Sequence, residues 1–343
     1  MIQIKDEGII LKATELPFEN EAVLNPTCVE VDGTVHMFYR AVRKGDFVSS
    51  VGYCQIDKDG KIVNRLDHPV LFPEHDYEKK GIEDPRAVFF EGTCYLFYTA
   101  YDGKNAMIAY ATSKDFEHFE KHGIISAQFS YDEAEDLSRK ANIMERYQFF
   151  ESMMKDRVGK DVRLWEKDSF IFPKKIKGKL ALVHRVLPGI QVAYFDSFSD
   201  LNDDYWRKYF LEMNKYIILD PNHGFESRNI GGGAVPIETE DGWLMIYHAV
   251  DDSKQGRIYQ AGAALLDIDD PTKVIGRLPV PLFSPKAEWE KKGDVDNVVF
   301  PTGCVVRDGY LFIYYGAGDK LIAAKSLELK SLLEELKNNA GTS

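Results

Sequence analysis

The chain has 343 residues, of which 44% are hydrophobic and 29% are charged, so it can bury a large core. Its 43 basic and 55 acidic residues give a formal net charge of −12, which argues against nucleic acid and anionic membranes as partners. Aromatic residues make up 13% of the chain, a content that favours strands over a helical bundle.

The N-terminal segment lacks the basic and apolar regions of a signal peptide, and no apolar run of about 18 residues occurs. The four cysteines lie far apart, and none belongs to a C-x-x-C pair; they are Cys28, Cys54, Cys94 and Cys304. We therefore predict neither a zinc cluster nor a disulfide framework. Reduced thiols in a cytoplasmic protein are expected.

Two short patterns recur along the chain. A brief apolar segment occurs five times, at residues 8–11, 69–72, 123–125, 216–219 and 280–283. The second pattern combines a strand that starts near a proline, a turn that ends in glycine, and a strand of aromatic and aliphatic residues. Its five copies start near Pro26, Pro85, Pro173, Pro236 and Pro301. Each copy predicts a β-hairpin.

Together the patterns divide the chain into units of about 60 residues, each able to supply four short antiparallel strands. Such units are typical of propeller blades, so five of them predict an all-β fold, a five-bladed β-propeller. The first apolar segment precedes its own unit, and we expect it to complete the last blade and close the ring. Because no linker divides the chain, residues 1–343 are predicted to form one domain.

The third unit is longer than the others by about 30 residues. Residues 131–158 contain neither Gly nor Pro, and their apolar side chains follow a 3-4-3 spacing. We predict a helical insertion at about 128–168, which packs beside the active-site mouth or forms a subunit contact. Leucines between residues 327 and 336 predict a C-terminal helix at about 325–339.

Equivalent positions of successive blades form a ring around a propeller axis. The residues before the five blade prolines are Asn25, Asp84, Phe172, Val235 and Phe300, and only Asp84 among them is ionisable. The residues that follow the Tyr or His of the second strand are Arg40, Thr99, Arg185, His248 and Gly316. Because hairpin partners are antiparallel, both rings share one mouth. The pattern predicts an acid beside an anion-binding cluster.

A structural alternative stays open for each of these residues. Asp84 could cap a turn, the two arginines could pair with carboxylates, and His248 could be an interior residue. We favour a functional site, because three basic groups face one acid in an acidic protein. Five tyrosines border the same mouth and could stack on sugar, although most are expected in the core. They are Tyr39, Tyr98, Tyr101, Tyr247 and Tyr315.

Several ordered motifs carry a family resemblance. They are GIEDPR (81–86), VHR (183–185), GGGAVP (231–236), GWLMIYH (242–248), NVVFPTG (297–303) and YYGAGD (314–319). These motifs resemble those of glycoside hydrolase family 130, which contains β-mannoside phosphorylases and mannosidases. The resemblance covers nearly the whole chain apart from the helical insertion, and it also implies a five-bladed propeller.

The resemblance implies roles for individual residues. Asp84 is the expected proton donor to the glycosidic oxygen, in the phosphorylases through a mannose hydroxyl. Arg185 and His248 are expected to bind phosphate, and Arg40 is predicted to join them. Lys208 is a guess for the further basic phosphate ligand of those phosphorylases. We also predict substrate-binding roles for Asn25, Arg86, Tyr101, Glu226, Asn297 and Asp319. Inorganic phosphate is the expected co-substrate, and no metal or other cofactor is expected.

Two reactions remain open. Inverting hydrolysis needs a general base about 6.5–9.5 Å from the acid, and Glu226 could serve. Phosphorolysis replaces that base with a bound anion, which the retained cations favour. We therefore predict inverting phosphorolysis of a mannose-containing oligosaccharide to α-mannose 1-phosphate. The alternatives are an inverting β-mannosidase and a non-catalytic carbohydrate-binding propeller. The sequence leaves the linkage, the leaving sugar and the formation of a homo-oligomer open.

Overall fold

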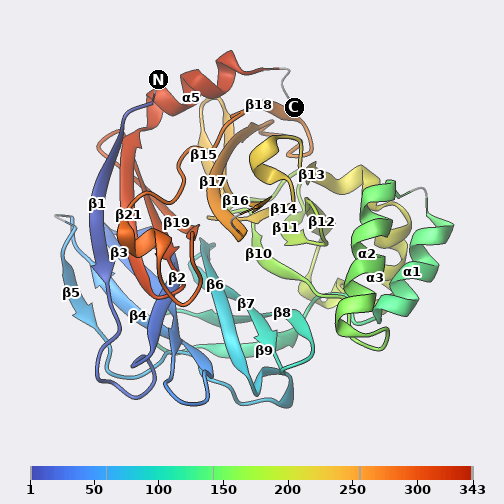
Figure 1. The fold of residues 1–343 in the computed structure, drawn as a ribbon, viewed down its shortest axis with the longest axis horizontal. Helices are drawn as coiled ribbons and strands as arrows, with labels where there is room; N and C mark the ends of the chain where they lie inside the picture. Colours follow the sequence, from blue (N-terminus) through green and yellow to red (C-terminus); the bar gives the residue numbers. More distant parts are fainter. Residues whose placement is uncertain (1, 59, 142, 255, 341–343) are drawn as a thin grey trace.

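Antiparallel strands are the main regular structure of the protein (Figure 1). The computed structural model describes residues 2–58, 60–141, 143–254 and 256–340. In this part of the chain the strands form four hydrogen-bonded sheets, which lie around a common centre in Figure 1. The all-β class predicted from the sequence is confirmed.

The largest sheet contains two sets of four strands. The first set comprises β2 (Ala22–Val31), β3 (Thr34–Val42), β4 (Ser49–Ile56) and β5 (Ile62–Arg65). The second comprises β6 (Gly81–Phe90), β7 (Thr93–Tyr101), β8 (Ala106–Ser113) and β9 (Glu120–Ile124). The two sets meet where Ser49 pairs in parallel with Gly81.

Two further sheets follow along the chain. One comprises β10 (Lys167–Ile171), β11 (Leu180–Arg185), β12 (Ile190–Phe195) and β13 (Ile217–Leu219). The other comprises β14 (Asn229–Gly232), β16 (Gly242–Ser253), β17 (Gly256–Leu266) and β18 (Val274–Arg277), and the short β15 (Ile237–Thr239) also pairs with β16.

The last sheet joins the two ends of the chain. It contains β19 (Val299–Arg307), β20 (Tyr310–Ala317), β21 (Leu321–Glu328) and the N-terminal strand β1 (Ile4–Leu11). β1 pairs antiparallel with β21, with Gly8 opposite Ala324 and Leu11 opposite Ile322. The N-terminal strand thus completes the last set of strands, as the sequence predicts.

Tight turns explain why the sequence forms these hairpins. Four of the turns have a residue with positive φ followed by a glycine with positive φ, a geometry that matches the twist of the flanking strands and favours Gly at the second position. They are Asp32–Gly33, Glu91–Gly92, Lys177–Gly178 and Asp308–Gly309. In the first of them, Val31 pairs with Thr34, so the turn contains only two residues.

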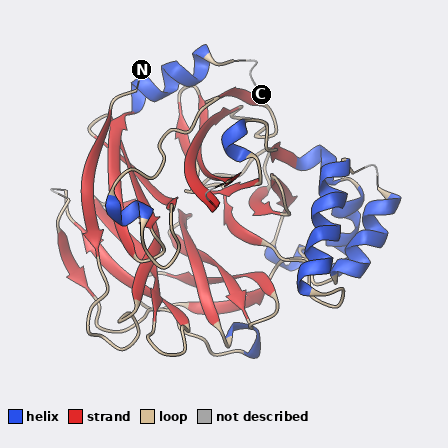
Figure 2. Cartoon of the chain, in the orientation of Figure 1, coloured by secondary structure: helices blue, strands red, loops and turns tan. Residues whose placement is uncertain are grey.

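The longer helices lie outside the sheets, as Figure 2 shows. α1 (Tyr131–Lys140) and α2 (Glu145–Val158) connect β9 to β10 within the predicted insertion, and α1 contacts α3 (Asp203–Leu211), which the sequence analysis did not predict. α5 (Leu329–Asn338) packs against β17, β18 and β21 through buried leucines. The short elements are α4 (Glu288–Lys291), η1 (Asp76–Glu78), η2 (Phe198–Asp200), η3 (Met213–Tyr216) and η4 (Gly224–Glu226).

A bulge interrupts the ladder between the first two strands in four of the sets. In three of these sets the bulged residue has a positive φ. These three residues are Asn25, Asp84 and Asp168, with φ angles of 48°, 50° and 58°. Asn and Asp tolerate this left-handed backbone better than most residues, which explains their choice. A bulge re-aims its side chain. The three polar side chains are therefore presented at equivalent places.

The bulges correct one predicted ring. Phe172 was expected beside Asn25 and Asp84 because all three precede a proline, but the structure has Asp168 at the equivalent bulge. Asp84 is therefore not the only ionisable residue of this ring. The proline was a poor reference point, since Pro173 follows the bulged residue by five positions rather than one.

Five glutamates with no exposed surface repeat around the molecule. They are Glu19, Glu78, Glu166, Glu226 and Glu290. Each accepts a hydrogen bond from a Tyr or His of a second strand, and this donor immediately precedes a member of the second predicted ring, which comprises Arg40, Thr99, Arg185, His248 and Gly316. The donors are Tyr39, Tyr98, His184, Tyr247 and Tyr315. Four of the carboxylates also form an ion pair; their cationic partners are Arg65, Lys121, Arg277 and Lys325. These four tyrosines are buried and therefore belong to the core, whereas they were predicted to border the mouth together with Tyr101.

These buried contacts are expected to determine much of the stability. Replacing Glu290 with Ala removes the acceptor of Tyr315 and the nearer carboxylate of Lys325, at 2.6 and 2.9 Å. We expect the free energy of unfolding, measured by urea denaturation, to fall by about 3 kcal/mol. Glu288→Ala, at an exposed position of the same short helix, is the control and should change it by less than about 0.5 kcal/mol. Equal effects of the two substitutions would contradict the account.

Candidate active site

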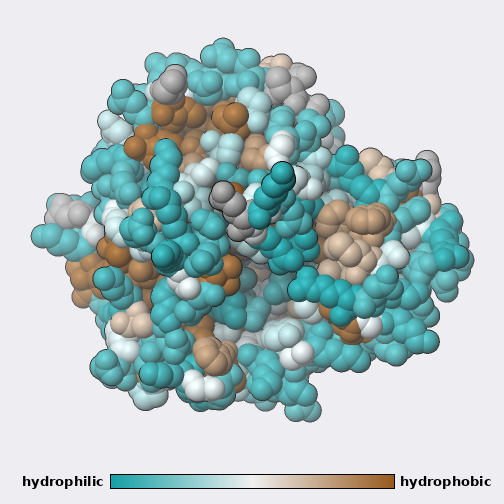
Figure 3. All heavy atoms as spheres, viewed as in Figure 1, coloured by the Kyte–Doolittle hydropathy of each residue, from teal (hydrophilic) through white to brown (hydrophobic). Residues whose placement is uncertain are grey.

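A cavity of about 300 Å³ collects residues from several sheets. It is lined by six of the predicted site residues: Asn25, Arg40, Asp84, Arg185, His248 and Asp319. The other four, Arg86, Tyr101, Glu226 and Asn297, do not line it. The surface in the orientation of Figure 3 is largely hydrophilic, with apolar side chains in separate patches.

One side of the cavity is built around Asp84. Asn25 donates a hydrogen bond from its Nδ2 to Asp84 Oδ1 at 2.7 Å, and Arg40 Nη1 lies 3.5 Å from the same oxygen. A Cβ atom at Gly316 would lie 2.1 Å from Asn25 Oδ1, so only glycine leaves room for this amide. Gly316, the member of the second predicted ring that has no side chain, thus permits the contact between Asn25 and Asp84.

Arg40 and Lys167 meet at Glu83, next to Asp84. Arg40 Nη2 lies 2.7 Å from one Glu83 oxygen, and Lys167 Nζ lies 3.2 Å from the other. Arg40 was predicted to join Arg185 and His248, but its ion pairs are with the carboxylates of Glu83 and Asp84. The cations predicted as one cluster therefore divide between two sides of the cavity.

The surrounding charges determine the protonation of two carboxyl groups. Burial opposes ionisation of Asp84, but the cations Arg40, Lys167 and Arg86 and the Asn25 amide together lower its pKa. Burial raises the pKa of Asp319 to about 6, with the charge of Asp84 adding to the effect and Arg40 opposing it. In the ligand-free cavity Asp84 is therefore a carboxylate at neutral pH.

The other side of the cavity contains Arg185, Asp168 and His248. Arg185 Nη1 lies 2.8 Å from Asp168 Oδ2 and 3.3 Å from His248 Nε2. Burial lowers the pKa of His248 to about 4, so the imidazole is neutral at neutral pH. Because arginine only donates hydrogen bonds, Nε2 is the acceptor and the proton of His248 lies on Nδ1.

Two buried donors on this side lack partners. Neither His248 Nδ1 nor Arg185 Nε has a hydrogen-bond partner within the described residues. Buried donors nearly always have a hydrogen-bond partner, so two donors without one in the same cavity are typical of a ligand site. His248 contributes a hydrogen bond here and not the positive charge that the sequence analysis assumed.

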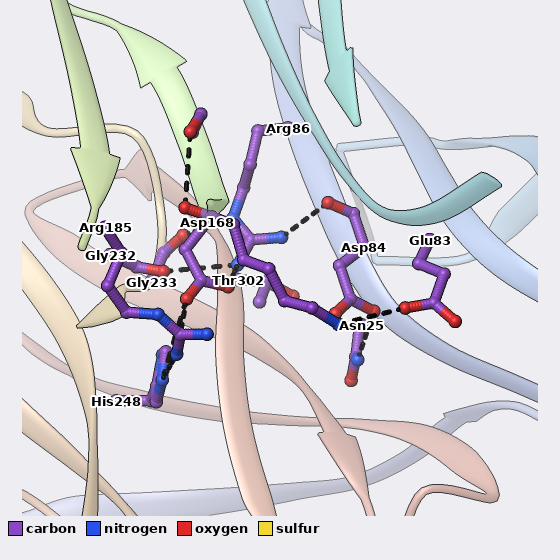
Figure 4. Close-up of polar contacts among 12 residues, drawn as sticks. Asn25, Glu83, Asp84, Arg86, Asp168, Arg185, Gly232, Gly233, His248 and Thr302 are labelled. Carbon is purple, nitrogen blue, oxygen red and sulfur yellow. Dashed lines mark hydrogen bonds and ion pairs between the residues drawn. The ribbon is translucent and has the colours of Figure 1, made fainter. Parts of the chain in front are cut away.

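Arg86 separates the two sides without facing the cavity. Its side chain is 0% exposed, and it donates to the carbonyl oxygens of Asp84 at 3.0 Å and of Gly233 at 2.6 Å. Its Nη2 also lies 3.6 Å from Asp168. Figure 4 shows Arg86 between Asp84 on one side and Asp168 with Arg185 on the other. Arg86, which was predicted to bind substrate, thus holds the two sides in place relative to each other.

The remaining predicted residues lie outside the cavity. Tyr101 lies behind Trp165, with ring centroids 6.4 Å apart, and the backbone carbonyl of Asn297 accepts a hydrogen bond from Tyr259. Glu226 is 0% exposed, and its oxygens accept from Tyr247, Arg277 and two backbone N–H groups. Glu226 occupies the same place as four other buried glutamates, which favours a structural role over that of a general base.

The helical insertion contributes to the cavity. Phe150, Met154 and Arg157, all from α2, belong to its lining. This placement agrees with the expectation that the insertion packs beside the mouth. Lys208, the guessed phosphate ligand, lies on α3 and lines a different depression.

Several lining residues escaped sequence reasoning. They are Trp165, Lys167, Asp168, Arg228, Asn229, Arg257 and Tyr259. One signal could have found Asp168. It follows the residue that pairs with Arg185, just as Asn25 follows the residue that pairs with Arg40. Counting from the second strand rather than from the proline would have identified the bulge.

The described residues contain neither a metal centre nor a helix that could span a membrane. No three or more His, Cys, Asp or Glu side chains are arranged to hold a metal ion. No helix among these residues has the length and apolar character needed to cross a membrane.

Comparisons with known proteins place the chain in a family. The family model described as β-1,4-mannooligosaccharide phosphorylase matches residues 7–338. A 1,2-β-oligomannan phosphorylase of Thermoanaerobacter sp. (strain X514) is 33% identical, covering 97% of this chain and 99% of that protein. A β-1,2-mannobiose phosphorylase of the same strain is also 33% identical, covering 96% and 97%.

A solved structure shows the same fold. The β-1,2-mannobiose phosphorylase of Listeria innocua in complex with β-1,2-mannobiose aligns with a TM-score of 0.72 at 23% identity, covering 98% of this chain and all of that one. The sequence motifs, the fold and the match over nearly the whole chain agree. The chain belongs to glycoside hydrolase family 130.

Proposed function

We propose that this protein cleaves β-mannosides by inverting phosphorolysis, with inorganic phosphate as nucleophile and α-mannose 1-phosphate as product. The observation that carries the proposal is the division of one cavity into a side with Asp84 and a side with the unpaired donors of Arg185 and His248. The two Thermoanaerobacter relatives that match nearly the whole chain are phosphorylases of β-1,2-mannosides, and we propose this linkage for the substrate here.

The geometry suits an inverting displacement. Such a reaction needs the nucleophile and the proton donor on opposite faces of the sugar ring. A phosphate held by Arg185 and His248 would attack from one side, while Asp84 supplies the proton at the other. A guanidinium forms strong, charge-assisted hydrogen bonds to phosphate, so Arg185 would orient the attacking oxygen. Glu226, the base considered for hydrolysis, is occupied by its own structural contacts.

Phosphate binding would also prepare the acid. Asp84 must hold a proton to act, directly or through a mannose hydroxyl, yet nearby cations lower its pKa in the ligand-free cavity. An arriving anion brings negative charge close to Asp84 and partly cancels the influence of those cations. Its pKa therefore rises when phosphate binds, so that phosphate and proton uptake are coupled. Arg40, which contacts the Asp84 carboxylate, is proposed to tune this equilibrium.

We also propose how the strands are arranged in the domain and where the protein is located. The five sets, four with four strands and one with five, are proposed to be the blades of one five-bladed propeller spanning residues 1–343. The pairing of β1 with β21 supports this view. The insertion and α5 would be additions to this single domain. A cytoplasmic location is supported by four cysteines without disulfides. The net charge of −12 favours sugar and phosphate over nucleic acid as partners.

Asp84→Asn tests the acid. Loss of a general acid costs about 10²–10⁴-fold, so we expect kcat for a β-mannobiose to fall by that factor. A 4-nitrophenyl β-mannoside should lose much less activity, because its leaving group needs little protonation. Circular dichroism and the melting temperature serve as controls for folding. Equal losses with both substrates would contradict a role of Asp84 in proton transfer.

Comparing Arg185→Ala with Arg40→Ala tests the two sides of the cavity. Arg185→Ala removes a charge-assisted contact to phosphate, so the KM for phosphate should rise on the order of 10–100-fold while the KM for the sugar changes little. Arg40→Ala removes a cation beside Asp84 and should act mainly on the pH dependence of kcat. If both variants raised the KM for phosphate alike, the proposed division of the cavity would be wrong.

A further inference from the structure

We propose that Asp168 makes the anion site specific for an oxyanion that carries a proton, such as phosphate or arsenate, and that it excludes sulfate. The inference rests on the proposed function, which places phosphate beside Arg185 and His248. It extends that function by assigning the selectivity of the site to one carboxylate, which the sequence analysis had not identified.

Asp168 is held firmly at the cavity. It is 3% exposed, lines the cavity and has a φ of 58° at its bulge. Two arginines flank its carboxylate, with Arg185 Nη1 at 2.8 Å and Arg86 Nη2 at 3.6 Å, and Nε2 of the neutral His248 lies 3.9 Å away. A Cβ atom at Gly231 would lie 2.6 Å from Asp168 Oδ2 and 2.3 Å from a His248 ring carbon. Glycine at this position therefore leaves room for both side chains.

The hydrogen-bonding capacities of the three groups differ. Arg185 only donates, and its Nε–H is unpaired. His248 offers an unpaired Nδ1–H. Asp168, as the ion-pair partner of Arg185, is a carboxylate and only accepts. A ligand that fits all three must accept two hydrogen bonds and donate one.

Protonated and unprotonated oxyanions differ in this respect. Near neutral pH, phosphate and arsenate keep at least one hydroxyl, which can donate to a carboxylate. Sulfate has a similar tetrahedral shape and charge but carries no proton, so it would face Asp168 with like charge and no hydrogen bond. A site that contains an acceptor of this kind rejects the ligand that cannot satisfy it.

Calorimetric titration of phosphate, arsenate and sulfate into the full-length protein tests the inference. For the wild type we expect phosphate and arsenate to bind with similar Kd and sulfate at least about tenfold more weakly. In Asp168→Asn, the amide can donate to sulfate and its negative charge is gone. The ratio of sulfate Kd to phosphate Kd should therefore fall by about tenfold or more.

Asp252→Asn is the matched control. Asp252 pairs with Arg228 and Arg257, two arginines that line the same cavity, at 2.7 and 3.6 Å. This variant removes the same charge near the same cavity, so both anions should respond alike and the ratio of their Kd values should stay that of the wild type.

The outcomes separate this inference from the proposed function. Wild-type protein that binds sulfate within threefold of phosphate, or an Asp168→Asn variant that keeps the wild-type ratio, overturns the inference. If β-mannobiose is still cleaved only in the presence of phosphate, the proposed function survives that result. If phosphate neither binds nor supports cleavage, both fail. Should Asp168→Asn not fold, the comparison of the three anions on the wild type decides alone.

Discussion

The hydrogen bond from a second-strand Tyr or His to a buried glutamate is the contact on which the site depends. It occurs five times, and in each case the next residue along the strand belongs to the predicted ring of site residues. His184 precedes Arg185, and Tyr247 precedes His248. Because consecutive strand residues point to opposite faces, anchoring one residue in the core fixes the direction of the next toward the cavity.

The bulges supply the second half of the site. In a regular ladder the side chains of Asp84 and Asp168 would follow the alternation of side chains between the two faces of the sheet. The positive φ angles at both positions change the direction in which these side chains point. Arg86, bonded to carbonyl groups on both sides, then holds the two halves together. The active site is therefore built from repeated backbone features, and only the identities of a few side chains distinguish the acid side from the anion side.

The sequence allowed much of this fold to be predicted, because hairpin turns and strand composition are local features. The repeat also identified Arg185 and His248 as cavity residues, since each follows the Tyr or His that bonds to a buried glutamate by one position in the sequence. Asp168 was missed because a proline was used as reference, and the burial of Glu226 was not predicted because it depends on contacts from distant strands. The separation of Arg40 from Arg185 could not be predicted either, since it depends on Glu83 and Lys167, which the ring pattern does not include.

The central claim is that the cavity delivers phosphate to one face of a mannoside and a proton to the other. Phosphorus-31 and proton NMR of a β-1,2-mannobiose reaction, run with and without phosphate, test it most directly. The account predicts cleavage only with phosphate and accumulation of α-mannose 1-phosphate. Free mannose formed at full rate in phosphate-free buffer, or a β-configured phosphate product, would contradict it.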